Sequence, residues 1–317
     1  MPSLLKRILF AAGLAFTVVL TGCEDDDPPP PPAASLAELI IADDNLSLFE
    51  EAVKQAGMME LLREPANLTL FAPENDAFGI IGIDLAAIAA MTIDEAKALV
   101  QYHIIEGKFI ADDLPDGPNA LQEVYSGDSV FFTRTATDLF VNGVTLRQSD
   151  LDANNGIMHK TNGVLVPPMG SILETIQAST ETLDSLIKAI DRVINEPGGD
   201  PGLAVTLHQD LLTAFAPSNQ AFSDLLDSLT LTDINEIPVV QLTEIVRYQF
   251  ASGRFFSPNL QDGPLTMLTG TTAQVSISGV APTIKGIGND DDRSTITTVN
   301  IATHNGVIQY IDRVLIP

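Results

Sequence analysis

The sequence predicts an α+β protein with two domains in tandem. Two observations support this prediction: the chain contains an internal repeat, and each copy shows helical periodicity early and strand patterns later. At roughly 100 to 200 residues per domain, a chain of 317 residues has room for two domains with cores of their own.

The repeat is clearest in a segment of nine residues. The sequence LFAPENDAF at residues 70–78 returns as AFAPSNQAF at 214–222, a spacing of 144 residues. Both copies end with an Asn-Gly pair, at 155–156 and 305–306, followed by a Leu-Val-Pro or Leu-Ile-Pro sequence. We therefore expect one domain at residues 35–168 and a second at 169–317.

Helices are predicted at the start of each copy. In the first copy Ser47 and Glu50 have the spacing of a capping box, and apolar residues follow at i, i+3, i+4 and i+7, namely Phe49, Ala52, Val53 and Ala56. The second copy has a similar stripe at Leu183, Leu186, Ile187, Ile190 and Ile194. The Gly- and Pro-rich stretch at 195–202 has no counterpart in the first copy, so we expect a surface loop there.

Strands are predicted later in each copy. In the first copy, the apolar segments 139–141 and 144–146 flank Asn142-Gly143. This dipeptide is the strongest local signal for a tight β-hairpin.

The repeated Phe-Ala-Pro-x-Asn box has a structural interpretation. Proline fixes φ and removes a donor, which ends a strand, and asparagine side chains bond the local backbone in turns. We expect the phenylalanines to anchor the core rather than to bind a ligand. The box residues with this predicted structural role are Phe71, Pro73, Asn75, Phe78, Phe215, Pro217, Asn219 and Phe222.

Three motifs in the same order, twice over, carry a family resemblance. The Phe-Ala-Pro-x-Asn-x-Ala-Phe box is followed by a Tyr-His pair and by a closing Asn-Gly-x-x-His…Pro box, and this arrangement resembles fasciclin domains. The resemblance covers nearly all of residues 35–317. It implies that each domain is a β-sandwich wedge with packed helices.

The resemblance also implies candidate residues for binding a partner. In animal relatives the segment around the Tyr-His pair is implicated in binding cell-surface receptors, which points here to Tyr102, His103, Tyr248 and Gln249. The alternative is that these residues belong to the core. The apolar residues near Tyr102 favour that alternative: Ile104, Ile105 and Phe109.

Both histidines of the first copy become glutamine in the second. Gln249 stands where His103 is expected, and counting back from the closing proline places Gln309 where the first copy has His159. Both side-chain types donate and accept hydrogen bonds, but only histidine titrates near neutral pH. We therefore predict that His103 and His159 are neutral, structural hydrogen-bonding groups.

The amino-terminal segment resembles a bacterial lipoprotein signal. Lys6 and Arg7 precede an apolar run that ends in the sequence Leu-Thr-Gly-Cys at 20–23. The run is shorter than the roughly 20 residues of a membrane-spanning helix, and the A-x-A-like site of an ordinary secretory signal is missing. The resemblance predicts a signal peptide at 1–22, lipid on Cys23, and an acidic, proline-rich tether at 23–34.

This interpretation predicts export and attachment to a membrane through the lipid. The acids at 24–27 allow two destinations: in some bacteria such acids direct a lipoprotein to the outer face, and in others they retain it at the inner membrane. We expect a place in the cell envelope, at the outer membrane or cell surface.

Composition and motifs exclude several classes of function. With 16 basic and 42 acidic residues the net charge is −26, so nucleic acid is not an expected partner. No nucleophile motif or zinc spacing surrounds the four histidines, and the sequence 150–154 departs from a calcium loop at its sixth and twelfth positions. The acidic stretch 289–292 is expected to be a solvated loop. We predict no enzyme activity, no cofactor and no bound metal.

The sequence thus predicts a surface-tethered adhesion protein whose partner is a protein or polysaccharide of the matrix or of another cell. The alternative function is structural or assembly work in the cell envelope, in which the repeats hold a neighbouring envelope protein.

Overall fold

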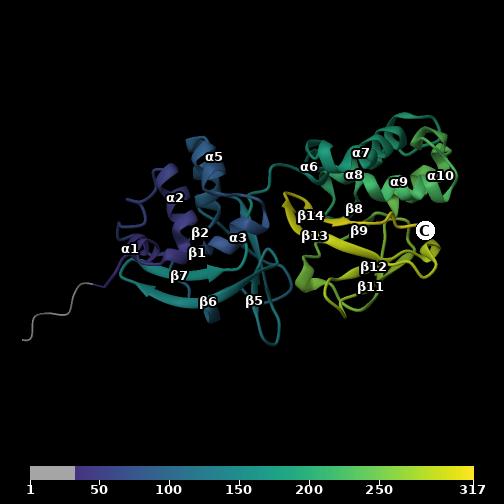
Figure 1. The fold of residues 1–317 in the computed structure, drawn as a ribbon. Coiled ribbons are helices and arrows are strands. Elements are labelled where there is room, and N and C mark those ends of the chain that lie inside the picture. The colour runs from purple at the N-terminus through teal and green to yellow at the C-terminus, as the bar shows by residue number, and fades with distance from the viewer. Residues whose placement is uncertain (1–32) are drawn as a thin grey trace, which may run out of the picture. The chain divides into compact units, whose positions relative to one another are not determined.

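The computed structural model describes residues 33–317 (Figure 1). The predicted signal peptide, the lipidation site Cys23 and the tether up to residue 32 lie outside the described residues. None of the described helices is both long and apolar enough to cross a membrane.

The first repeat forms an α+β domain with a seven-stranded sheet of order β2-β1-β7-β6-β5-β4-β3. Strands β1 and β7 run parallel, and the other neighbours are antiparallel. The helices are α1 (Leu36–Ile41), η1 (Asp44–Leu46), α2 (Ser47–Gln55), α3 (Asn75–Ile80), α4 (Leu85–Ala90), α5 (Ile93–Tyr102) and η2 (Ala111–Asp113). The strands are β1 (Leu68–Pro73), β2 (Ile104–Glu106), β3 (Ala120–Glu123), β4 (Ser129–Arg134), β5 (Leu139–Val141), β6 (Val144–Ala153) and β7 (Gly156–Thr161).

The second repeat has the same topology, with the sheet order β10-β11-β12-β13-β14-β8-β9 and a parallel pair formed by β8 and β14. Its helices are α6 (Ile172–Ala178), α7 (Thr180–Asn195), α8 (Leu203–Gln209), α9 (Asn219–Ser228), η3 (Ile234–Glu236), α10 (Val239–Arg247), η4 (Ser257–Asn259) and η5 (Ile287–Asn289). Its strands are β8 (Leu212–Pro217), β9 (Phe250–Ser252), β10 (Gly263–Thr266), β11 (Thr272–Ser276), β12 (Thr283–Lys285), β13 (Ser294–Thr303) and β14 (Gly306–Ile311).

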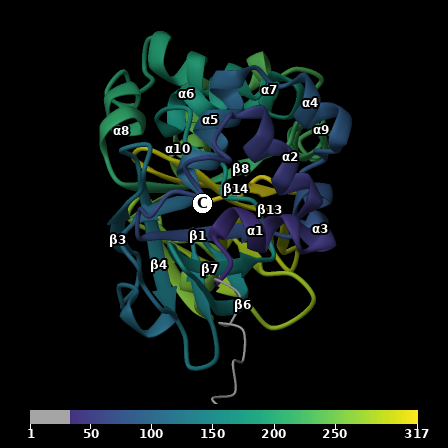
Figure 2. The ribbon, with the colours of Figure 1, turned by 90° about the vertical axis from the view of Figure 1, so that its left-hand side faces the viewer.

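Each domain has two apolar cores. In the first domain the helices pack on one side of β1 and β7, around Phe49 and Phe78, while Phe71 and Phe132 lie in a second core between the strands. The second domain divides its buried residues in the same way. Figures 1 and 2 show the helices of each domain gathered on one side of its strands. The fold is the predicted α+β class.

Two local predictions are confirmed. Strands β5 and β6 form a hairpin, and Asn142 and Gly143 at its tip both have positive φ, as this tight turn requires. Helix α7 carries the predicted apolar stripe, in which Leu183, Leu186 and Ile190 are fully buried.

The predicted capping box at Ser47 is wrong. Ser47 is the first residue of α2 rather than its cap, and no described side chain caps this helix. The reason is the short helix η1 directly before it, capped by Asp43, which leads the backbone into α2. The Ser47 hydroxyl instead accepts a hydrogen bond from Asn75.

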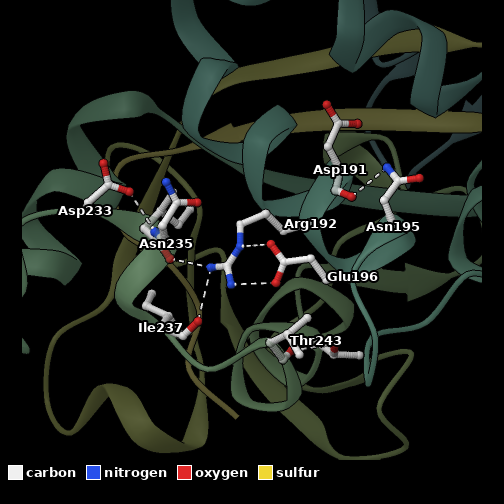
Figure 3. A network of polar contacts seen from close by, with 10 residues as sticks. Asp191, Arg192, Asn195, Glu196, Asp233, Asn235, Ile237 and Thr243 are labelled. Atoms are coloured by element: carbon white, nitrogen blue, oxygen red, sulfur yellow. Dashed lines mark hydrogen bonds and ion pairs between the residues drawn. The ribbon is translucent and has the colours of Figure 1, made fainter.

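The stretch after α7 in the second domain is held by polar contacts. The guanidinium group of Arg192 pairs with the Glu196 carboxylate at 2.7 and 2.9 Å and donates to the carbonyl oxygens of Ile234 and Ile237 (Figure 3). Asp200 forms an ion pair with Arg247. The inserted loop is therefore tied to η3 and α10 by side chains that local sequence patterns do not connect.

The two domains touch through β4 and the residue before β3 in the first domain, and through η4 and the segment before it in the second. The Arg254 guanidinium lies 3.7 Å from the centre of the Phe131 ring. The backbone carbonyl of Arg254 accepts a hydrogen bond of 2.6 Å from the Asn119 side chain. The Asn259 amide donates to the Thr133 hydroxyl at 2.9 Å. Cation–π and hydrogen-bonding contacts of this kind fix the approach of two surfaces.

Candidate functional site

Tyr102, the first candidate residue for partner binding, is completely buried at the end of α5. Its hydroxyl donates to the Ser129 carbonyl at 3.0 Å and accepts from the Asn142 amide at 2.9 Å. Burial raises the pKa of the Tyr102 hydroxyl to about 12, because the phenolate would lose its hydration. Tyr102 thus links the helical part of the domain to the β5–β6 hairpin.

His103 is buried next to Tyr102. Its Nδ1 lies 2.8 Å from the Leu99 carbonyl oxygen, and its Nε2 accepts from the Leu165 backbone N–H at 2.9 Å. A ring that donates at Nδ1 and accepts at Nε2 is neutral. Burial lowers the pKa of His103 to about 4, so this neutral form persists well below pH 6.

In the second domain Gln249 makes the connections that His103 makes in the first. Its Nε2 donates to the Ile245 carbonyl at 2.7 Å, and its Oε1 accepts from the Leu315 N–H at 3.1 Å. The neighbouring Tyr248 is also fully buried, and its hydroxyl donates to the Thr272 carbonyl at 2.7 Å. All four candidate residues therefore lie inside the domains, where a partner's surface does not reach them directly.

His159 and Gln309 form a second matched pair. The His159 Nδ1 accepts from the Asp150 backbone N–H at 3.2 Å, and its Nε2 lies 3.1 Å from the Phe109 carbonyl. Burial lowers the pKa of His159 as well. Gln309 accepts from the Asn300 N–H at 2.9 Å and donates to a carbonyl, that of Phe255, at 2.9 Å.

These two side chains hold an irregularity in a long strand. Asp150 in β6 and Asn300 in β13 have φ angles of 64° and 66°, and the pairing with the next strand shifts register beside them. A bulge leaves a backbone N–H without a partner in the ladder. The buried imidazole or carboxamide supplies the missing acceptor. The sequence predicted a hydrogen-bonding group at these positions but not the bulge that it stabilises.

The asparagine of the Phe-Ala-Pro-x-Asn box bonds a distant helix. Asn75 accepts from the Leu48 N–H at 3.0 Å and donates to the Asp44 carbonyl at 2.9 Å, some thirty residues away in sequence. Asn219 does the same for α7, accepting from Ser185 and donating to Glu181. The expectation that these side chains bond their local turn is wrong, because the preceding strand brings them to the start of the helix.

Asn155 and Asn305, in the closing Asn-Gly pairs, each make three hydrogen bonds to backbone groups. Asn155 accepts from Leu36 at 2.9 Å and donates to the carbonyls of Leu62 and Glu64 at 2.8 and 2.9 Å. The glycine that follows is also required, since a Cβ on Gly156 would lie 2.2 Å from a backbone oxygen of β1. The sequence marked these asparagines through their recurrence in both copies, but it did not predict their hydrogen bonds.

The remaining polar clusters also have structural partners. The carboxylate of Asp150 accepts from the Ala111 N–H at 2.7 Å, and Asp152 pairs with Lys108 at 2.7 Å. Within residues 33–317 no group of three or more histidine, cysteine or acidic side chains is placed to hold a metal ion. The Asn289 side chain, in the acidic stretch 289–292, donates to the Val314 carbonyl and accepts from the Ile316 N–H, both in the segment after β14.

One serine–histidine contact resembles part of a hydrolase site. The Ser171 hydroxyl lies 2.8 Å from Nδ1 of His208, and Glu174 lies close by. In a catalytic triad the acid orients the histidine through its second nitrogen. Here the Glu174 carboxylate instead accepts hydrogen bonds from the Ser171 hydroxyl at 2.9 Å and from the Ser171 backbone N–H at 2.7 Å. These contacts belong to the capping box of α6.

The sequence profile of the fasciclin domain matches residues 44–167 and 199–317. The chain belongs to the fasciclin-domain family. Transforming growth factor-beta-induced protein ig-h3 of Sus scrofa is 27% identical over 258 residues, which is 80% of this chain and 35% of that protein. Human periostin is 29% identical over 159 residues, which is 49% of this chain and 18% of that protein.

A shorter fasciclin relative is matched over most of its length. Protein sll1483 of Synechocystis sp. is 30% identical over 137 residues, which is 43% of this chain and 74% of that protein. A solved structure described as a FAS1 domain pair from the insect cell adhesion molecule fasciclin I covers 89% of this chain and 96% of that chain, with a TM-score of 0.40 and 14% identity. This chain thus spans about a third of the ig-h3 protein and less than a fifth of periostin.

Proposed function

We propose that this fasciclin protein is a surface-tethered adhesion or binding protein that contacts extracellular matrix, polysaccharide or other cells. The observation that carries the proposal is the use of the repeated residues. The residues that both domains share, such as Tyr102 and Tyr248, form hydrogen bonds inside the domains. The outer faces of the two fasciclin domains are therefore free to carry recognition.

Three exposed apolar side chains of the first domain, one on each of the consecutive helices α3, α4 and α5, are candidates for such recognition. Ile80, Leu85 and Ile93 are more than half exposed although they are large aliphatic residues. A surface that binds another molecule typically exposes apolar side chains of this kind. In this proposal the buried tyrosine and histidine support the surface and the exposed residues make the contacts.

The binding test is an array experiment. The purified protein is immobilised through its amino-terminal side and exposed to polysaccharides, matrix proteins and envelope proteins of the host, at low and at physiological salt. Saturable binding to an external glycan or matrix protein is the expected result. Binding only to the host's own envelope proteins would replace adhesion by an assembly role.

A matched pair of variants locates the contact. Replacing Ile80, Leu85 and Ile93 together by serine is expected to weaken binding to the ligand found on the array at least tenfold, equivalent to about 1.4 kcal/mol. The control replaces the exposed Val205 and Val240 of the second domain by serine and is expected to leave affinity within twofold. The reverse pattern would move the contact to the second domain.

The proposed tether is tested separately. Cys23→Ser is expected to abolish incorporation of labelled fatty acid and to move the protein from the detergent phase to the aqueous phase, because Cys23 carries the only thiol in the sequence. Equal labelling of both forms would reject lipidation at this residue.

A further inference from the structure

A pocket of about 340 Å³ lies where the β5–β6 hairpin tip, the end of α3, the segment 162–169, helix α6, the start of η4 and strand β13 meet. This volume falls within the range typical of small-molecule sites. Its lining includes Ile80, Val166, Met169, Thr175 and Ala302.

The lining of this pocket is unusual for so acidic a chain. The protein carries a net charge of −26, yet none of the described residues that line the pocket is charged. The rim is apolar and open to solvent, since Ile80 is 74% exposed and Met169 is 79% exposed. Such a surface favours an apolar occupant without a net charge.

One polar group in the lining is unsatisfied. The Thr175 hydroxyl of α6 has no hydrogen-bond partner within residues 33–317, and its side chain is only 6% exposed. A buried hydroxyl without a partner costs free energy, which a ligand group that donates or accepts a hydrogen bond would recover. Two other polar side chains of the lining have partners within the protein: Asn142 bonds Phe131 and Tyr102, and Asn300 bonds Ser257 and Gly143.

We propose that this pocket binds a small, uncharged and largely apolar molecule that carries one hydrogen-bonding group directed at Thr175. The apolar body replaces water along Val166, Met169 and the aliphatic part of β13, and the single polar group meets the hydroxyl. This site is separate from the exposed helix face proposed for a macromolecular partner, except that Ile80 borders both.

The test uses three probes of the same shape. 1-Naphthol is neutral and has a hydroxyl, naphthalene lacks the hydroxyl, and 1-naphthoate is charged. Binding is followed in the whole purified protein through ¹³C-methyl signals of methionine, with Met169 at the rim as reporter and the buried Met267 as a control for the fold. We expect saturable shifts of Met169 with 1-naphthol, weaker binding of naphthalene and none of 1-naphthoate.

Variants separate this site from non-specific binding. Thr175→Val is expected to weaken the binding of 1-naphthol about threefold to tenfold, the usual contribution of one hydrogen bond, and to leave the binding of naphthalene unchanged. Ala302→Phe is expected to fill the pocket and abolish binding of both, whereas Val205→Phe adds the same ring on α8 and is expected to change neither. An unmoved Met169 signal, equal binding of 1-naphthoate, or an equal effect of Thr175→Val on both neutral probes would each overturn the proposal.

Discussion

In the first fasciclin domain a histidine connects the end of α5 to the closing segment of the domain, and in the second a glutamine makes the same connection. His103 donates to the carbonyl four residues before it and accepts from Leu165, while Gln249 donates to the carbonyl four residues before it and accepts from Leu315. His159 and Gln309 differ in the same way at the strand bulge.

This comparison shows which property of the side chain the fold requires. Both positions need one donor and one acceptor at the right separation, and a neutral imidazole or a carboxamide supplies them. The two domains differ in what happens when the pH falls. Only the imidazole can take up a proton, and doing so would remove the acceptor that the backbone N–H requires.

The largest expected effect concerns the asparagines that the domains share. Asn155→Ala is expected to destabilise the first domain by about 4 kcal/mol, because it leaves three backbone groups without partners. Asn305→Ala removes the same set of bonds from a more exposed site and is expected to cost about 2 kcal/mol. Hydrogen exchange read by mass spectrometry reports the two domains separately in urea.

A matched control is Asn154→Ala, which removes one exposed hydrogen bond and is expected to cost less than about 1 kcal/mol. If Asn155→Ala costs no more than this control, the buried asparagine does not hold the first domain together as described.

The second effect is a pH dependence of stability that comes from His103 and therefore concerns the first domain. Burial lowers the folded-state pKa of His103 to about 4 from the ordinary 6.5. The unfolded chain therefore takes up a proton below pH 6.5 that the folded domain does not. The stability that comes from a neutral His103 is complete above pH 6.5 and is lost as the pH falls towards 4.

Between pH 7 and pH 5, the free energy of unfolding of the first domain is thus expected to fall by about 2 kcal/mol more in the natural protein than in His103→Gln. Carboxylates titrate equally in both proteins, so their contribution cancels in the difference. Gln249→His is expected to give the second domain the same sensitivity. Urea unfolding at each pH, followed by domain-resolved hydrogen exchange, measures both; parallel pH profiles for variant and natural protein would contradict a buried neutral histidine.

At pH 7 the double replacement His103→Gln and His159→Gln tests whether the first domain accepts the side chains of the second. A cost below about 3 kcal/mol is expected, because the hydrogen bonds can be kept. A greater loss in equilibrium unfolding would mean that ring packing, such as the stacking of His159 on Phe71, matters more than the hydrogen bonds.

The smallest expected effect concerns the two buried tyrosines. Tyr102→Phe is expected to cost about 2 kcal/mol and Tyr248→Phe about 1 kcal/mol, because Tyr102 also satisfies the buried Asn142 amide, whereas the second contact of Tyr248 is a long one of 3.3 Å from Ile287. Urea midpoints at pH 7 check the order. Removing the Asn142 amide as well, in Tyr102→Phe with Asn142→Asp, would show whether the two groups act as a pair.

The sequence by itself determined the duplication, the α+β class and several local elements. The hairpin at Asn142-Gly143 and the stripe of α7 were predictable because a turn dipeptide and a period of 3.6 residues act over a few neighbouring positions. The exchange of histidine for glutamine also appeared in the sequence, and it pointed to a hydrogen-bonding role.

Only the tertiary structure decided where those residues act. Asn75 reaches the start of α2, Arg254 packs on Phe131 of the other domain, and Thr175 lies in a pocket that six separate segments line. Each of these contacts joins positions far apart in the chain. Local propensity and periodicity carry no record of such pairings, because the packing of whole strands and helices creates them.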